Sequence, residues 1–283
     1  MNPEYFLNAD ITLFKAYDHA AVKKAFDYIV NDSSIEFRYP QGGCQQRAHV
    51  MSLILEHTFH IEHCKLWLFS PAALMLNNDQ ALFINDPNEF AEDKRIEWNY
   101  HVVPVVKLKT TNDTCQMILD PSLDKNRLLP LSEFFTMIGN AGISRYTFML
   151  PDKYFFNTSV VDNMPTNIFD GSFFDFDECV KDDLTMEKGL ASNDMAMKIY
   201  NSYVQHLVQS TDDNEIRKLN DLKAIFGNAT AVDLLFSQNI SGKSANTSYR
   251  YVMKNYPGIM EEARRIFYSR LAYWTEFTNA LLS

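Results

Sequence analysis

The sequence predicts an α+β fold, in which a core of helices and an antiparallel sheet is followed by an α-helical C-terminal extension. Apolar residues recur at helical spacing between residues 19 and 56, short β-branched runs occupy residues 64–120, and helical spacing returns from about residue 187. We place a boundary near residue 160, which divides the chain into domains of residues 1–160 and 161–283.

Two helices are expected before the sheet. The first covers His19 to Val30, with Val22, Ala25, Phe26 and Ile29 on one face. A short extended piece, Ile35–Tyr39, runs into Pro40, which disfavours helix at the preceding residue. The second helix begins at Cys44 and continues to about Glu56.

Four short runs read as strands of an antiparallel sheet, because polar loops separate them. The loop Thr110–Asp113 has hairpin length and joins the last two strands. If the hairpin is symmetric about Asn112, Val103 lies opposite Asp120. The four runs are Cys64–Phe69, Ala81–Ile84, Ile96–Leu108 and Cys115–Asp120.

The C-terminal part contains four helical patterns. An aromatic and acidic segment, Tyr146–Glu178, precedes them, and we interpret its Phe155-Phe156 and Phe173-Phe174 pairs as packing residues. The final helix is the longest and places Ile266, Leu271, Trp274 and Phe277 on or near its core side. The patterns cover Met195–Leu207, Ile216–Phe226, Asn228–Phe236 and Ile259–Leu282.

The composition argues against several functional classes. Asp and Glu number 36 against 26 Lys and Arg, a formal charge of −10, so nucleic acid is not expected as a partner. No apolar run is long enough to span a bilayer, and the N-terminus has no basic, signal-like region. The four cysteines, Cys44, Cys64, Cys115 and Cys179, show no paired spacing, which favours a reducing compartment and a cytoplasmic location.

Cys44 is the candidate nucleophile. It stands at the expected start of a helix, where the free amide groups and the helix dipole favour a thiolate. Gly42 and Gly43 allow a tight turn before it and leave room for a substrate backbone. The amides of Gly43 and Cys44 are candidate donors to an oxyanion.

His101 and Asp120 are the candidate base and its orienting carboxylate. In the expected register the two are diagonal neighbours on one face of the hairpin, and their backbones on the two strands are about 7–8 Å apart. A carboxylate can bridge that gap to an imidazole and hold it as a general base.

Three stretches resemble the bacterial protein-glutaminases. These are FRYPQGGCQQRAHVMSLIL (37–55), WNYHVVPVV (98–106) and MILDPSL (117–123), with KLWLF (65–69) between the first two. The resemblance implies a transglutaminase-like fold over residues 1–160 and a Cys44–His101–Asp120 triad that converts glutamine side chains of proteins to glutamate. It also makes Trp98 and Tyr100 candidate substrate-binding residues. No metal or organic cofactor is implied.

Other conspicuous residues receive structural interpretations. Arg47 is interpreted as a helix-surface or ion-pairing residue and His49 as a packing or capping residue. The remaining cysteines are interpreted as buried small residues, and the pairs Asp182-Asp183 and Asp212-Asp213 as turn or helix-cap charges. A zinc site at His57, His60, His63 and Cys64 is disfavoured, because helix gives way to strand within the group.

The function expected from the sequence is deamidation of an accessible glutamine in a protein substrate, reached through an open groove. A transglutaminase or a cysteine peptidase would use the same triad. A protein of another class, an adaptor with a vestigial triad, would bind a host protein through its C-terminal helices. Without a signal peptide, the chain is expected in the cytoplasm or as a bacterial effector translocated into a host cell.

Overall fold

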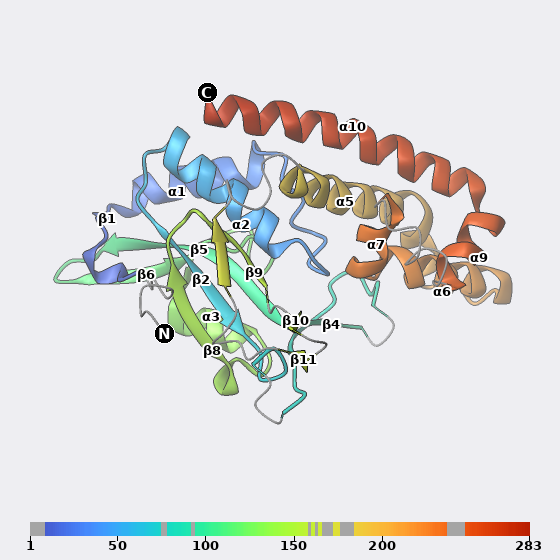
Figure 1. The fold of residues 1–283 in the computed structure, drawn as a ribbon, viewed down its shortest axis with the longest axis horizontal. Coiled ribbons are helices and arrows are strands. Elements are labelled where there is room, and N and C mark those ends of the chain that lie inside the picture. Colours follow the sequence, from blue (N-terminus) through green and yellow to red (C-terminus); the bar gives the residue numbers. More distant parts are fainter. Residues whose placement is uncertain are drawn as a thin grey trace.

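A mixed sheet with helices on both faces forms the first half of the protein, and five helices make up most of the described part of the second half. The computed structural model describes residues 9–74, 78–91, 94–157, 160–161, 164–165, 172–175, 184–236 and 247–283. In Figure 1 the helices α5 and α10 lie above α2, and α2 lies on the sheet. The predicted α+β fold and the C-terminal helices are therefore confirmed.

The central sheet has six strands. Five follow the order β7-β6-β5-β2-β8 with antiparallel neighbours, and β1 adds to β5 in parallel. The expected strand of residues 96–108 is instead two strands, because Asn99 separates β4, which pairs with β3, from β5 in the central sheet. The strands of the central sheet are β1 Ala16–Tyr17, β2 Cys64–Phe69, β5 Tyr100–Lys109, β6 Thr114–Ile118, β7 Leu129–Pro130 and β8 Arg145–Met149.

Three small two-stranded sheets stand outside it. They pair β3 with β4, β9 with β12, and β10 with β11. The Phe155-Phe156 and Phe173-Phe174 pairs face each other across β9 and β12, but their side chains lie outside the described residues. The strands are β3 Leu82–Asn85, β4 Arg95–Trp98, β9 Lys153–Asn157, β10 Val160–Val161, β11 Met164–Pro165 and β12 Ser172–Asp175.

The helices before residue 160 cover the two faces of the central sheet. α1 (His19–Asn31) buries the four apolar residues that helical spacing selects, as predicted. α2 (Cys44–Leu53) continues as a π-helical turn, Ile54–Thr58, which confirms the predicted extent of the second helix. α3 (Leu131–Met137) buries Phe134 against the opposite face. The piece 35–39 is not a strand.

Of the helices after residue 184, α5 and α10 pack on α2, and α6, α7 and α9 pack on one another and on α5 and α10. Three of the four predicted patterns correspond to single helices, and the first spans α5 and two short turns, Tyr200–Val204 and Gln205–Leu207. α9 was not predicted. The helices are α5 Thr185–Ile199, α6 Asp213–Phe226, α7 Ala229–Leu235, α9 Thr247–Asn255 and α10 Pro257–Leu282.

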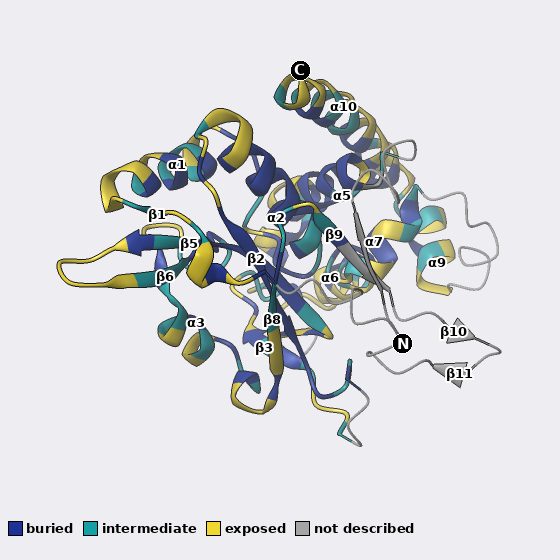
Figure 2. Ribbon diagram, turned by 60° about the vertical axis from the view of Figure 1, so that its left-hand side comes forward, coloured by how far each residue is buried: buried dark blue, intermediate teal, exposed yellow. Residues whose placement is uncertain are grey.

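α2 is enclosed by the sheet and α5. Figure 2 shows it and β2 coloured as buried along most of their length, whereas α6 and α10 keep an exposed side. Nearly every residue of α2, including Arg47 and His49, is buried. The helix that carries the candidate nucleophile is thus held from both sides, which fixes the position of its first residue. Among the described residues, no helix combines the length and the apolar character needed to cross a bilayer.

Candidate active site

The candidate nucleophile begins α2. Gly43 precedes it with φ 75°, a left-handed conformation that favours glycine, and its carbonyl oxygen accepts from the backbone N–H of Arg47 at 3.0 Å. Cys44 follows as the first helical residue and is 8% exposed. Its thiol therefore lies at the positive end of the helix dipole, which favours an anion there.

His101 and Asp120 form a buried hydrogen-bonded pair. His101 Nε2 lies 2.7 Å from Asp120 Oδ2, and the side chains are 2% and 3% exposed. The backbone N–H of Ser122 donates to Asp120 Oδ1 at 3.1 Å. The carboxylate is thereby held by both oxygens, and it holds the imidazole in turn.

The predicted hairpin register is confirmed. β5 and β6 pair Val105 with Ile118, and the bond from Leu119 N to Pro104 O, 3.0 Å, extends the ladder by one residue. One step further places Val103 opposite Asp120, as the sequence predicts. The diagonal relation of His101 to Asp120 follows from this register.

Two aromatic rings hold the plane of the imidazole. The ring of Trp98 stacks on His101 at 4.6 Å and 12°, and Phe134 lies on the ring at 6.1 Å and 18°. The indole Nε1 of Trp98 donates to Pro40 O at 2.9 Å. Trp98 is therefore placed to orient His101, and contact with a substrate stays a prediction.

The thiol and the His–Asp pair line the same small pocket, which also receives Arg47 and Ala48. Because Nε2 is bonded to Asp120, Nδ1 is the ring atom left for the thiol, and among the described residues it has no hydrogen-bond partner. Burial lowers the pKa of His101, but the carboxylate of Asp120 and the nearby thiol of Cys44 outweigh burial and raise that pKa to about 9. This arrangement favours a protonated imidazole beside the thiol at neutral pH.

Arg47 belongs to this centre, so its interpretation as a helix-surface residue is wrong. It is 3% exposed, and its Nη1 donates to Tyr39 O at 3.1 Å and Gly42 O at 2.8 Å. Burial raises the pKa of Asp120, but His101 and the charge of Arg47 lower that pKa by a larger amount. The net shift of the Asp120 pKa is therefore downward. Its position three residues after Cys44, on the same side of the helix, was the signal available in the sequence.

Among the described residues, the space around the thiol is closed, and the expected open groove does not reach Cys44. The pocket shared by Cys44 and His101 has a volume of about 10 Å³, about that of a single water molecule. The space beside the two glycines is filled as well. A Cβ on Gly42 would lie 2.5 Å from Ala229 Cβ, and one on Gly43 would lie 2.1 Å from Asn193 Nδ2. The glycines therefore make room for α7 and α5, not for a substrate backbone.

Tyr100, the other predicted substrate-binding residue, lies beside the thiol. Its carbonyl oxygen is 4.0 Å from Cys44 Sγ, and its half-buried ring packs against Trp67 at 5.6 Å. Burial and the charge of Cys44 raise the pKa of Tyr100. Contact of this ring with a substrate, like the oxyanion role of the Gly43 and Cys44 amides, stays a prediction.

Apart from Arg47, the residues given structural interpretations do not line the pocket of Cys44, His101 and Asp120. Cys64 is fully buried, which raises the pKa of its thiol to about 12, and Cys115 is half-buried. Asp212 caps α6, as predicted, by accepting from the backbone N–H groups of Asn214 and Glu215. Among the described residues, no three His, Cys, Asp or Glu side chains gather as metal ligands. Cys179 and Asp182-Asp183 lie outside the described residues.

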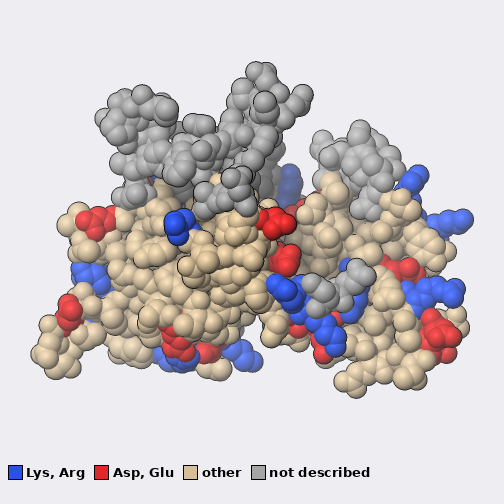
Figure 3. Space-filling model, turned by 90° about the horizontal axis from the view of Figure 1, so that it is seen from below, with Lys and Arg blue, Asp and Glu red and all other residues tan. Residues whose placement is uncertain are grey.

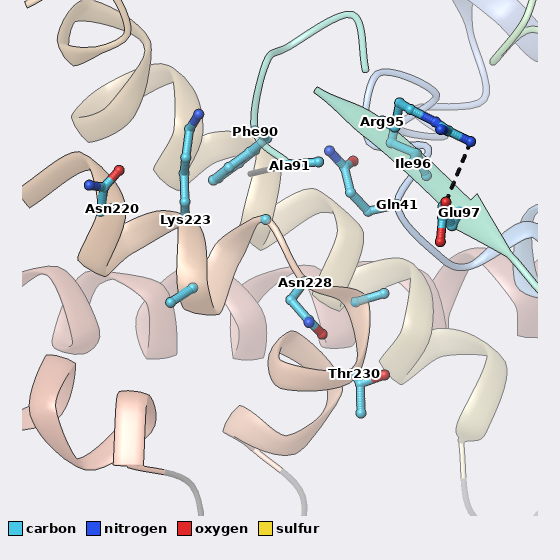
Figure 4. Close-up of a pocket in the computed structure, with 13 residues that line it drawn as sticks. Gln41, Phe90, Ala91, Arg95, Ile96, Glu97, Asn220, Lys223, Asn228 and Thr230 are labelled. Carbon is cyan, nitrogen blue, oxygen red and sulfur yellow. Dashed lines mark ion pairs between the residues drawn. The ribbon is translucent and has the colours of Figure 1, made fainter. Parts of the chain in front are cut away.

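A larger groove of about 610 Å³ opens between β4 and the helices α6 and α7. Figure 4 shows Gln41, Arg95 and Glu97 on one side and Asn220, Lys223 and Asn228 on the other. Arg95 Nη2 lies 3.5 Å from Glu97 Oε1, which makes the two side chains an ion pair. On the molecular face drawn in Figure 3, acidic and basic side chains are interspersed, and neither sign forms an extended patch.

Cys44, His101 and Asp120 all lie in a segment that matches a known protein family. Residues 21–138 match the family described as Glutaminase. The resemblance to protein-glutaminases is thus confirmed, and this glutaminase-like segment (residues 21–138) contains Cys44, His101 and Asp120. No curated protein matches the chain.

Solved structures of protein-glutaminases match parts of this chain at low sequence identity. The solution structure of the enzyme from Chryseobacterium proteolyticum is 24% identical, with 50% of this chain and 76% of that chain covered and a TM-score of 0.40. A crystal structure of protein-glutaminase is 22% identical, with 60% and 86% covered and a TM-score of 0.43. A crystal structure of pro-protein-glutaminase is 19% identical, with 62% and 58% covered and a TM-score of 0.45.

Proposed function

We propose that this protein is a cysteine hydrolase that deamidates glutamine side chains of proteins, giving glutamate and ammonia. The observation that carries the proposal is the shared pocket of Cys44 and the hydrogen-bonded His101–Asp120 pair. The match of residues 21–138 to glutaminases supports it, because all three residues fall in that segment. A transglutaminase-like fold for residues 1–160 is part of the same proposal.

The chemistry uses the three side chains in two half-reactions. The Cys44 thiolate attacks the carboxamide carbon, and the C–N bond breaks as His101 protonates the leaving nitrogen, which departs as ammonia. Water then gives a proton to His101 and its oxygen to the thioester carbon, so that glutamate leaves and the thiol is restored. Asp120 holds the ring so that Nδ1 faces the thiol in both steps.

The substrate is a protein with an accessible glutamine, and its entry requires movement around the thiol. Cys44 is 8% exposed and the pocket beside it is water-sized. The two methylene groups and the carboxamide of a glutamine side chain do not fit that space. We infer that the side chains over Cys44 move apart when substrate binds, because otherwise the thiol cannot reach the carboxamide carbon.

The proposal is tested by incubating the protein with a glutamine-containing protein such as casein, then measuring released ammonia and new glutamates by mass spectrometry. Wild-type protein and a Cys115→Ala control should release ammonia, and Cys44→Ala should release none, with an unchanged unfolding temperature. Ammonia release by Cys44→Ala at the wild-type rate would overturn the assignment.

The same experiment separates the alternatives. Cross-linked products would indicate a transglutaminase, in which an amine replaces water, and shortened chains would indicate a peptidase. Binding of a host protein without any chemical change would indicate an adaptor. Iodoacetamide should modify Cys44 much faster than Cys64 or Cys115 if Cys44 is an activated nucleophile. A cytoplasmic or effector location, and a host partner for the C-terminal helices, stay predictions.

A further inference from the structure

A second polar pocket lies beside the turn that precedes Cys44, residues 40–43, which we call the nucleophile loop. The pocket is on the side of the C-terminal helices. Gly43, Gln45 and Gln46 line it from the glutaminase-like segment, and Asn193 of α5 and Asp233 of α7 line it from the other half. Its volume is about 20 Å³, about that of one or two water molecules. Gln45 links it to the nucleophile, because its Oε1 is 3.5 Å from Cys44 Sγ.

Two buried polar atoms of this lining lack hydrogen-bond partners among the described residues. They are Asn193 Nδ2, a donor, and Gln46 Oε1, an acceptor, on side chains that are 5% and 9% exposed. Folded proteins pair nearly all such atoms, because a buried polar group without a partner costs about 1–3 kcal/mol. A donor and an acceptor left open in one pocket therefore indicate a ligand that carries both functions.

Glycine contacts place the two amide side chains at the nucleophile loop. A Cβ on Gly43 would lie 2.1 Å from Asn193 Nδ2, so only glycine lets this amide approach the residue before Cys44. A Cβ on Gly189 of α5 would lie 2.7 Å from Gln46 Nε2 in the same way. The close approach of α5 thus brings Asn193 to the loop, although Asn193 lies outside the glutaminase-like segment.

We propose that this pocket binds the primary carboxamide of the substrate, with Asn193 Nδ2 donating to its oxygen and Gln46 Oε1 accepting from its NH₂ group. The inference rests on the proposed deamidase function and gives the C-terminal helices a part in substrate recognition. A carboxylate offers only acceptor atoms, so the pocket selects glutamine over the glutamate product. Gln45 is half-buried in the lining and moves to admit the carboxamide.

Alkylation of Cys44 tests this recognition without catalytic turnover. Iodoacetamide presents a carboxamide and iodoacetate a carboxylate, and the thiolate displaces iodide from either. The ratio of the two rates at Cys44 is measured by mass spectrometry and divided by the same ratio for free cysteine. We expect a preference of about tenfold for iodoacetamide in the wild type, and its loss in Asn193→Leu, which removes the donor at similar size and adds no charge. Asn220→Leu, an exposed substitution in the groove of Figure 4, should keep the wild-type preference.

An unchanged ratio in a folded Asn193→Leu variant, or no preference in the wild type, would overturn the inference. If Asn193→Leu does not fold, Asn193→Ala removes the donor with a smaller side chain. Its kcat/KM for a glutamine peptide should fall by about 10²-fold, and wild-type kcat/KM in a folded Asn193→Ala would equally overturn the inference. A carboxamide preference in a protein that releases no ammonia would leave the pocket standing and reject the deamidase function.

Discussion

The two ring nitrogens of His101 have different surroundings. Nε2 is bonded to Asp120, Nδ1 is open toward the thiol, and Trp98 stacks on the ring face. Arg47 adds a buried positive charge near Asp120 and Cys44 without a carboxylate partner among the described residues, and it ties down the loop before Cys44 through two carbonyl groups. The charge states of His101 and Asp120 are therefore coupled, since Asp120 raises the pKa of His101, and His101 and Arg47 lower the pKa of Asp120.

Asp120→Asn should lower kcat by about 10²–10⁴-fold while the protein stays folded. The amide cannot hold the same imidazole tautomer, and it removes the negative charge that raises the pKa of His101 to about 9. The alkaline limb of kcat, expected near that pH as His101 loses its proton, should shift to lower pH. Asp124→Asn, which changes a carboxylate paired with Arg127, is the control. A variant with the wild-type limb would exclude Asp120 as the orienting group.

At the scale of elements, the start of α2 depends on contacts from three directions. β5 brings His101, the Arg47 side chain holds the carbonyl groups of the preceding loop, and α5 presses Asn193 against Gly43. Tyr39 Oη also donates to Phe226 O of α6 at 2.8 Å. The nucleophile loop is therefore shaped by helices that are more than a hundred residues away in the chain.

Gly43→Ala should destabilise the protein by at least about 2 kcal/mol, because an L-residue is strained at this φ and the new Cβ meets Asn193. Gly142→Ala is the matched control, since nothing lies within 4 Å of its Cβ position. Urea unfolding of the two variants provides the measurement. Equal free energies of unfolding for both would show that the left-handed turn before Cys44 is not required for folding.

At the scale of the whole molecule, one hydrophobic cluster joins both halves. Val22 of α1 and Ile54 after α2 belong to the same cluster as Leu190 of α5 and Trp274 of α10. Asp194 of α5 also accepts from Arg270 Nε at 2.5 Å and Trp274 Nε1 at 2.7 Å, which fastens α10 to α5. The division into residues 1–160 and 161–283 stays a prediction, and the shared cluster means that stability is not separable at residue 160.

Buried bases behind α2 should make the stability of the whole protein fall in acid. Burial, the main cause, lowers the pKa of His63 from 6.5 to about 4, so the folded protein holds the ring neutral while the unfolded chain takes up a proton. This contribution is complete above pH 6.5 and is lost as pH falls toward 4, a difference of about 3 kcal/mol.

Free energies of unfolding measured in urea between pH 7 and pH 5 test this expectation. His63→Asn should reduce the pH dependence, because asparagine can still donate to Ile61 O, the partner of His63 Nδ1, but does not titrate. His57→Asn, at an exposed position, should keep the wild-type slope. An identical slope in the His63→Asn variant would assign the acid sensitivity to other groups.

Local patterns in the sequence were enough for the elements and for the candidate triad. Periodicity placed α1 and α10 nearly to the residue, because one face of each must be apolar. A short apolar run placed β2, which is buried along its whole length. The hairpin register followed from loop length alone, and with it the pairing of His101 with Asp120. These features depend on neighbours close in the chain or on a period that the residues themselves carry.

Tertiary packing decided what surrounds the thiol. Arg and Gln are residue types that usually lie on the surface of a helix. Arg47 and Gln46 are nevertheless buried, because the sheet and α5 enclose α2. Gly42 and Gly43 suggested space for a substrate, but Ala229 and Asn193 occupy it. The burial of these residues depends on the sheet and on helices about 150 residues or more further along the chain. No local pattern around Cys44 records those contacts. The meeting of Cys44, His101 and Asp120 in one pocket could therefore be predicted from the sequence, and the closed surroundings of that pocket could not.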